Sequence, residues 1–466
     1  MSTPQRSVAK PSGSGRSFSS FMQRLGDGAA SFGIRWIPDP FALAVILTLM
    51  VFGAALAFTP HGPVELIDQW YGGFWRLLTF AMQMVLIVVT GFGLATAPSM
   101  QRALRWVASL PRSRTGAIVV TALAGSILSF LHWGVGLIVS AFLAREVARY
   151  ARDNGLAVHF PLLAAAAYGG GVISQTGLTS SGALLVNTPG HFLESSIGLI
   201  PLSETIFQPY NLIFVLLTVV VTPLLLALLH PSPTTTVVYA GQDDDDSVEE
   251  PLTDEERRLP ANRVNRSRIL CWAIALGGLF FVVRYILAEG LLGLDLNVLN
   301  FGFLMLGLLM HGSLGNYSRA IMRASSAAGG IILQFPFYAG ILGLMAGSGL
   351  FSMIADWFVS ISTPDTFPLY SMISAALVNF AVPSGGGQWA VQGPIATAAA
   401  LQLGLPAHLA VMSVMMGDQL TNLAQPFWLL PILGVTGLKA GQVMGYTILL
   451  MFVVFIINAA CLLWLV

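Results

Sequence analysis

Residues 383–392 have the sequence PSGGGQWAVQ and interrupt an apolar segment that is otherwise typical of a membrane-spanning helix. A proline followed closely by three glycines cannot continue an α-helix without a large loss of stability. Inside the hydrocarbon core of a bilayer, irregular backbone is tolerated only where it is buried in protein or lines a water-filled cavity. The break therefore predicts a binding site inside a membrane protein.

The composition indicates an all-α polytopic membrane protein. Of the 466 residues, 55% are hydrophobic and 9% are charged, whereas about 25% are charged in a soluble domain. Several apolar segments are as long as the ~20 residues that a helix needs to span a bilayer. The apolar segments lie near residues 41–58, 74–97, 115–150, 160–190, 209–230, 268–287, 295–311, 325–346, 367–400, 405–433 and 441–466.

Neither an enzyme nor a nucleic-acid-binding protein is favoured by the residue pattern. The net charge is zero, and the 7 histidines show no spacing typical of metal ligands. No phosphate-binding loop occurs in the sequence, so we do not expect this chain to drive transport with ATP. We expect no cofactor and no bound metal. Cys271 and Cys461 lie in apolar segments, which is typical of buried, inert thiols.

One charged segment divides the chain into two halves. Residues 231–267 contain the acidic run 243–246, further acidic residues and then four arginines, a composition typical of a solvated linker. We therefore predict a basic cytoplasmic arm at residues 1–38 and a first transmembrane repeat at 39–230. The acidic cytoplasmic linker at 231–267 and a second transmembrane repeat at 268–466 follow.

The two halves share three features in the same order and at nearly the same offset along the chain. Each half has a glutamine in an apolar segment, then a broken segment, then a glycine in a polar, interrupted segment. The matched positions are Gln83 and Gln334, residues 132–134 and 383–385, and Gly169 and Gly417. Such self-similarity suggests an internal duplication, which is the usual architecture of secondary transporters.

The placement of basic residues predicts that segments 115–150 and 367–400 are re-entrant hairpins. If each returns to the side it entered from, and the N-terminus is cytoplasmic, only Arg76 and Arg284 of the 22 Lys and Arg residues lie outside. A full crossing by the first segment would export Arg145 and reverse every later loop. The resulting topology has about nine crossings, two hairpins and a periplasmic C-terminus, and it makes the halves inverted repeats.

The hairpin tips are the candidate substrate site. Half-helices inside a membrane present unpaired N–H groups and a partial positive charge at their N-termini, which attract anions. No Lys or Arg lies deep within the broken segments, so a bound carboxylate would rest on backbone amides and neutral donors. The candidate substrate-binding residues are His132, Trp133, Gly134, Asn187, Thr188, Gln334, Ser384, Gly385, Gly386, Gly387, Gln388 and Trp389. The structural alternatives are close helix packing for the glycines and internal hydrogen bonding for His132 and Gln334.

Asp418 is the one carboxylate placed well inside an apolar segment. An acid within the membrane is a functional candidate, either as a proton carrier or as a cation ligand. Together with Asn422 and Gln425 it forms the candidate ion-coupling set. The structural alternative is a hydrogen-bonded anchor that holds the broken helix.

Four strings then carry a family resemblance. They are NFAVPSGGGQW at 379–389, QFPFYAG at 334–340, AQPFW at 424–428 and AREVAR at 144–149. With them the chain resembles the bacterial short-chain fatty acid transporter family, which includes the acetoacetate/butyrate carrier, over nearly its whole length. The resemblance implies ion-coupled uptake of small monocarboxylates such as butyrate or acetoacetate across the bacterial inner membrane. It also implies membership of the broader ion-transporter group, whose members use paired hairpins.

The coupling ion stays open between H⁺ and Na⁺. Dicarboxylate carriers of that group hold sodium at Ser-Asn-Thr hairpin tips, whereas this chain has residues 132–134 and 383–385 there. The alternatives are a dicarboxylate carrier, a sodium/proton antiporter, or a membrane-embedded enzyme or channel. A dicarboxylate would need a second cationic partner, and an enzyme would need a pair such as His132 and Ser384 in contact. The expected partners are the monocarboxylate, the lipid bilayer and a second copy of the chain.

Overall fold

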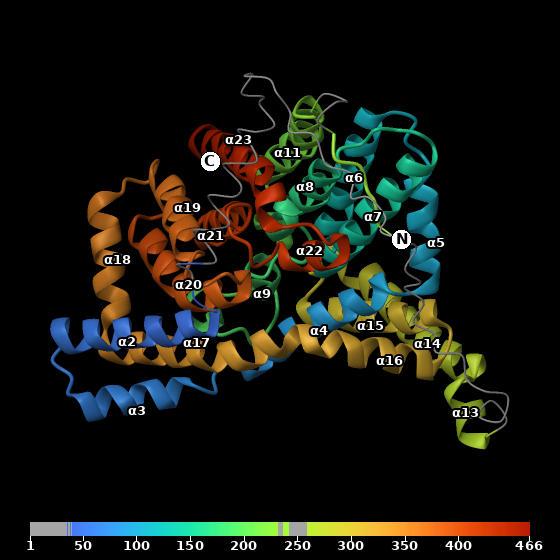
Figure 1. The fold of residues 1–466 in the computed structure, drawn as a ribbon. Coiled ribbons are helices and arrows are strands. Elements are labelled where there is room, and N and C mark those ends of the chain that lie inside the picture. Colours follow the sequence, from blue (N-terminus) through green and yellow to red (C-terminus); the bar gives the residue numbers. More distant parts are fainter. Residues whose placement is uncertain (1–34, 36–37, 39, 232–235, 242–258) are drawn as a thin grey trace, which may run out of the picture.

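The computed structural model describes residues 35, 38, 40–231, 236–241 and 259–466, and within them the chain is helical, with no β-strand (Figure 1). The predicted basic arm, apart from residues 35 and 38, and the acidic part of the predicted linker lie outside the described residues. Seven of the described helices are long and apolar enough to cross a membrane. The prediction of an all-α polytopic protein is therefore confirmed.

The first half contains three long helices, a helical hairpin and a region of short helices. The elements are α2 (Pro40–Phe58), α3 (Pro63–Gly73), α4 (Leu78–Ala95), α5 (Pro98–Ala108), α6 (Arg114–Leu131), α7 (Trp133–Asp153), α8 (Phe160–Gly170), η1 (Gly171–Thr176), α9 (Ala183–Val186), α10 (Glu194–Ile197), η2 (Leu202–Glu204) and α11 (Pro209–Leu228). Five of these helices, α3, α5, α6, α8 and α11, begin at a proline in the first turn or at a serine N-cap, both of which favour helix initiation.

The second half follows a similar plan. Its elements are α13 (Pro260–Asn265), α14 (Arg268–Glu289), η4 (Leu291–Gly293), α15 (Leu296–His311), α16 (Leu314–Ala324), η5 (Ser325–Ala328), α17 (Gly329–Ser348), α18 (Leu350–Ile361), α19 (Phe367–Val378), α20 (Gly385–Gln402), α21 (Ala407–Asn422), α22 (Leu430–Thr436) and α23 (Ala440–Trp464). The sequence reading did not anticipate α3, α5, α16 and α18 as separate helices, because their apolar runs are short.

Helix order and contacts run in parallel in the two halves. In the first, α4 and α5 precede the hairpin α6–α7 and then α8; in the second, α17 and α18 precede α19–α20 and then α21. Helix α8 packs against both arms of its hairpin, and α21 packs against both arms of the other. Gln83 and Gln334 each stand sixth in their helices. The repeat boundaries themselves stay predictions.

Close helix contacts within each half depend on glycine. A Cβ atom on Gly170 of α8 would lie 2.6 Å from the Ala122 carbonyl of α6. A Cβ on Gly417 of α21 would collide with the Met372 carbonyl of α19. The glycine of α8 that makes this contact is therefore Gly170, one residue after the predicted Gly169, and small side chains let both helix pairs approach closely.

Figure 1 shows α2, α17, α4, α15 and α16 in a layer along one side of a bundle that contains α6–α8, α11 and α19–α23. Helix α4 packs against α7, and α17 packs against α20, so each hairpin is held by one helix of the layer. The hairpin breaks, at His132 and at residues 379–384, lie inside the molecule, where the candidate site is found.

One described part of the linker, residues 236–241, is attached to the first half. Residues 236–241 run past the start of α8, where the Val237 carbonyl accepts from the Phe160 amide at 2.8 Å and the Val237 amide donates to Nδ1 of His159 at 3.0 Å. Nη1 of Arg152 donates to the Gly241 carbonyl at 2.9 Å. This stretch of the linker is therefore packed against the ends of α7 and α8.

Candidate functional site

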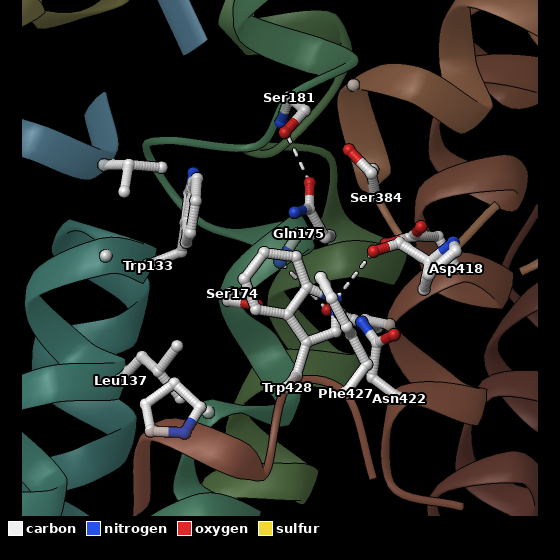
Figure 2. Close-up of a pocket in the computed structure, with 18 of the residues that line it drawn as sticks. Trp133, Leu137, Ser174, Gln175, Ser181, Ser384, Asp418, Asn422, Phe427 and Trp428 are labelled. Carbon is white, nitrogen blue, oxygen red and sulfur yellow. Dashed lines mark hydrogen bonds between the residues drawn. The ribbon is translucent and has the colours of Figure 1, made fainter. Parts of the chain in front are cut away.

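A cavity of about 510 Å³ lies between the break of the α19–α20 hairpin and helices α7, α8, η1 and α21 (Figure 2). Its volume falls in the range of about 300–1,000 Å³ that is typical of small-molecule sites. Much of its wall is apolar. The apolar wall residues include Met84, Val88, Phe92, Leu137, Ile138, Phe335, Phe427, Trp428, Leu430 and Pro431.

The second hairpin tip meets this cavity with an open helix N-terminus. Ser384 is the N-cap of α20, and its Oγ accepts from the Gly387 amide at 3.3 Å while its carbonyl accepts from the Gln388 amide at 2.7 Å. The amides of Gly385 and Gly386 have no hydrogen-bond acceptor in the described part of the chain, and both residues line the cavity. Two unpaired N–H groups at the positive end of an 18-residue helix are therefore available to a ligand.

The first hairpin tip is closed by its own residues. Nδ1 of His132 accepts from the amides of Gly134 and Val135 at 3.1 and 3.3 Å, and the Trp133 amide donates to Oγ1 of Thr179 at 2.9 Å. The His132 carbonyl accepts from the Gly136 amide at 2.8 Å. The first four amides of α7 are thus satisfied within the protein, and no open N-terminus faces the cavity.

The structure brings together eight of the predicted site residues on the cavity wall. They are Trp133, Gly134, Gln334, Ser384, Gly385, Gly386, Asp418 and Asn422. They come from both halves of the chain, so residues of both broken segments line one cavity, while their part in substrate binding stays a prediction.

Several predicted substrate-binding residues lie elsewhere. His132 is buried, with its ring edge-on to Phe303 at 4.3 Å between centroids, and it is absent from the cavity wall. Asn187 donates to the carbonyls of Leu292 and Leu294. Thr188 accepts from the amide that begins α15. These residues stabilise contacts between helices instead of lining the site.

The C-terminal part of the glycine-rich stretch also turns away from the cavity. Gly387 packs against Tyr338, and Nε2 of Gln388 donates to the Ala375 carbonyl and to Oε1 of Gln392. Trp389 is fully buried. After the first turn of α20, the face occupied by these residues packs against the protein, so the predicted contact of the ligand with Trp389 is not supported.

Asp418 lies on the cavity wall without a counter-charge. Its side chain is fully buried, and neither carboxylate oxygen has a hydrogen-bond partner in the described residues. No Lys or Arg is among the residues that line the cavity, and no three His, Cys, Asp or Glu side chains of the described chain could hold a metal. Burying an unpaired charge is costly, so this carboxyl is favoured in its protonated form or beside a bound cation.

The other two predicted ion-coupling residues do not offer oxygen ligands to the cavity. Oδ1 of Asn422 accepts from Nδ2 of Asn379 at 2.8 Å and from Nε2 of Gln425 at 2.7 Å. Gln425 is absent from the cavity wall. The Asn422 oxygen is therefore already used, and the residue presents its amide nitrogen to the site.

Residues 174–182 contribute more to the wall than the sequence reading assigned to them. Ser174, Gln175 and Ser181 line the cavity together with Gln419. The polarity of this stretch is the signal that could have placed it in the site. Two aromatic residues after α21 that line the cavity, Phe427 and Trp428, were also missed. Trp428 donates from Nε1 to the Pro383 carbonyl at 2.9 Å and packs edge-on against Trp133.

Comparison with known proteins identifies the family to which the chain belongs. The family model for short chain fatty acid transporters matches residues 21–465. The chain belongs to the short-chain fatty acid transporter family. It is therefore a multi-pass membrane transport protein and not an enzyme, and the predicted resemblance is confirmed.

Two relatives in this family cover nearly the whole transporter. A protein of Escherichia coli (strain K12), named as a proposed short-chain fatty acid transporter, is 39% identical over 422 residues, which are 90% of this chain and 94% of the relative. A protein of the same name from Haemophilus influenzae (strain ATCC 51907 / DSM 11121 / KW20 / Rd) is 37% identical over 433 residues, 91% of this chain and 96% of the relative.

Two solved structures share the fold of this family member. The YdaH transporter of Alcanivorax borkumensis, described as having an unusual topology, aligns with a TM-score of 0.55 and 16% identity over 92% of this chain and 98% of its own. MtrF of Neisseria gonorrhoeae, described with a class of antimetabolite efflux pumps, aligns with a TM-score of 0.52 and 15% identity over 96% and 97%. At these identities the likeness concerns the fold alone.

Proposed function

We propose that this protein is a secondary transporter that carries short-chain monocarboxylates, such as butyrate and acetoacetate, across the bacterial inner membrane together with a proton. The observation that carries the proposal is the open N-terminus of α20 on the wall of a cavity that no Lys or Arg lines. Such a site suits a ligand with one negative charge, which backbone amides and neutral donors can satisfy.

The carboxylate of the substrate would lie at the N-terminus of α20. The amides of Gly385 and Gly386 and the hydroxyl of Ser384 are donors of suitable type there. Hydrogen bonds to a charged group contribute about 1.5–3 kcal/mol each, so these contacts would dominate the affinity.

The alkyl tail would lie against the apolar wall that includes Phe335, Phe427 and Leu137. Each buried CH₂ group contributes about 0.8 kcal/mol, which corresponds to roughly a fourfold change in affinity. Because the cavity is larger than a four-carbon acid requires, we expect shallow discrimination by chain length.

Asp418 would couple transport to protons. A substrate carboxylate and an ionised Asp418 in one cavity without a cation would repel each other, so substrate binding would favour the protonated acid. One monocarboxylate anion and one proton then cross together with no net charge. We therefore expect uptake to follow a proton gradient and to be unaffected by the membrane potential.

Uptake of labelled butyrate into proteoliposomes, under separately imposed proton and sodium gradients, tests this proposal. We expect the proton gradient alone to drive accumulation and Asp418→Asn to abolish it. Asp356→Asn is the matched control, because Asp356 is exposed and its carboxylate is bonded only to Gln402 in the described chain. Accumulation driven by sodium alone would refute the role of Asp418 as a proton carrier.

The dicarboxylate alternative is tested in the same vesicles. The cavity wall offers no Lys or Arg for a second carboxylate, so excess succinate should leave butyrate uptake unchanged. Strong competition by succinate would favour a dicarboxylate carrier. Formation of a homodimer stays a prediction that cross-linking in native membranes can address.

Alternating access between two inverted repeats is part of the proposal. The cytoplasmic N-terminus, periplasmic C-terminus and re-entrant hairpins predict that Lys439 faces the cytoplasm and Arg284 the periplasm. We expect a membrane-impermeant thiol reagent added to whole cells to label Arg284→Cys and to spare Lys439→Cys. Both native cysteines are buried, so they should give little background. The opposite labelling pattern would contradict this topology.

A further inference from the structure

Two glutamines on the cavity wall, Gln175 and Gln419, each use the side-chain oxygen to accept from a backbone N–H group. Oε1 of Gln419 accepts from the backbone N–H of Gln175 at 3.0 Å, and Oε1 of Gln175 accepts from the backbone N–H of Ser181 at 2.9 Å (Figure 2). A backbone N–H can only donate, so each side-chain amide must present its oxygen to the protein. The NH₂ group of each glutamine is therefore the end that remains for another partner.

The same arrangement recurs in the other side-chain amides of the wall. Asn422 uses Oδ1 to accept from two donors, Asn379 and Gln425. Oε1 of Gln334 is within 3.2 Å of the Tyr338 hydroxyl. Every Asn and Gln on the cavity wall thus has its oxygen engaged within the protein, and none of their NH₂ groups donates to a described residue.

These donors lie beside the open helix N-terminus. A Cβ atom on Gly385 would stand 2.8 Å from Nε2 of Gln175, so this amide group is in contact with the start of α20. Gln419 is 2% exposed, and its Nε2 is buried with no partner in the described chain. An unpartnered buried donor is costly, and it is satisfied when an acceptor enters the cavity.

We propose that Gln175 and Gln419 are the specificity-determining residues of the transporter, donating from Nε2 to the two carboxylate oxygens of the substrate. Asn422, three residues after Gln419 on the same helix, extends the donor array. The inference rests on the proposed function for the identity of the ligand. An array of donors with no oxygen acceptor among its amides selects a carboxylate over the neutral amide or alcohol of the same shape.

Gln419→Glu tests this assignment, because the new side chain keeps the oxygen that accepts from Gln175 and replaces only the NH₂ donor. Binding of labelled butyrate to purified full-length protein is measured with butyramide as the competitor. In the wild type we expect butyrate to bind far better than butyramide. In Gln419→Glu at neutral pH we expect butyrate affinity to fall at least tenfold and butyramide to compete better, since its NH₂ group can donate to the introduced carboxylate.

Gln175→Glu is a second variant with the same expectation, because it keeps the acceptor for Ser181. Gln101→Glu is the control, since Gln101 lies on α5 away from the cavity wall and should leave both affinities unchanged. At acidic pH the introduced carboxyl becomes a donor again, so the loss of butyrate affinity relative to the wild type should shrink.

The outcomes separate the two proposals. Wild-type protein that does not bind butyrate overturns the proposed function. Wild-type binding with unchanged butyrate preference in both glutamine variants overturns the inference and leaves the proposed function standing. If neither variant yields monodisperse protein, the premise that only the amide oxygens support the fold is wrong, and the inference fails on that ground.

Discussion

The hairpins α6–α7 and α19–α20 occupy the same place in their halves, yet their tips are chemically opposite. At the first tip, His132 and Thr179 accept from the first three amides of α7. At the second, the Ser384 hydroxyl accepts from one amide of α20, and the amides of Gly385 and Gly386 stay open on the cavity wall. A repeated framework can therefore assign a structural role to one tip and a ligand-binding role to the other.

The difference follows from the side chains at each tip. The imidazole of His132 reaches two amides at once, and a threonine from the neighbouring segment completes the cap. The serine hydroxyl reaches only one amide, and the glycines after it place no side chain between their N–H groups and the cavity. The predictions below test whether the open tip carries transport and the closed tip carries stability.

Gly386→Leu should have the largest effect on butyrate uptake. A Cβ on Gly386 would lie 3.1 Å from Phe80 and 3.2 Å from Met84, so a leucine overpacks the wall and blocks the open amides. We expect butyrate uptake in membrane vesicles to fall by about 50-fold or more, with insertion preserved. Gly53→Leu is the control, because a Cβ there would meet open space outside the local backbone of its own helix α2. Normal uptake by Gly386→Leu would disprove the location of the site.

Ser384→Ala should have the next largest effect on uptake. The change removes the N-cap of α20 and one donor at the site, and we expect kcat/KM for butyrate to fall by about 10- to 100-fold. Ser113→Ala removes a comparable N-cap from α6, whose hydroxyl accepts from the Gly116 amide. Both variants should lose about 1 kcal/mol of stability. If Ser384→Ala and Ser113→Ala took up butyrate equally well, the Ser384 hydroxyl would stabilise the fold without contacting the substrate.

His132→Ala should change uptake least and stability most. It leaves the amides of Gly134 and Val135 without an acceptor inside the protein, which we expect to cost about 2–4 kcal/mol. The melting temperature in detergent should fall clearly, while the butyrate affinity of the folded protein stays within about threefold of wild type. His132→Asn should recover part of the stability, because asparagine is a good N-cap. A large loss of affinity without loss of stability would place His132 in the site after all.

Much of the candidate site could be predicted because its signals are local. The glycines at 385–386, the polar Asp418 segment and Gln334 all depart from the composition of a lipid-facing helix. What could not be predicted is which face of each helix meets the cavity. Trp389 follows the break by only a few residues, but it points into the protein interior. Gly386, three residues earlier in the same helix, lines the cavity wall instead.

The sequence by itself determined that this is a helical membrane protein of the short-chain fatty acid transporter family, with breaks near residues 132 and 383–384, although the glycines 385–387 that signal the second break begin helix α20 in the structure. Composition and backbone preference act over short stretches, so they can be read without the fold. The tertiary structure decided which tip is open and where each amide donates. Those properties depend on partners far away in the chain, such as Gln175 and Gln419, which are 244 residues apart and meet only when the two halves pack together.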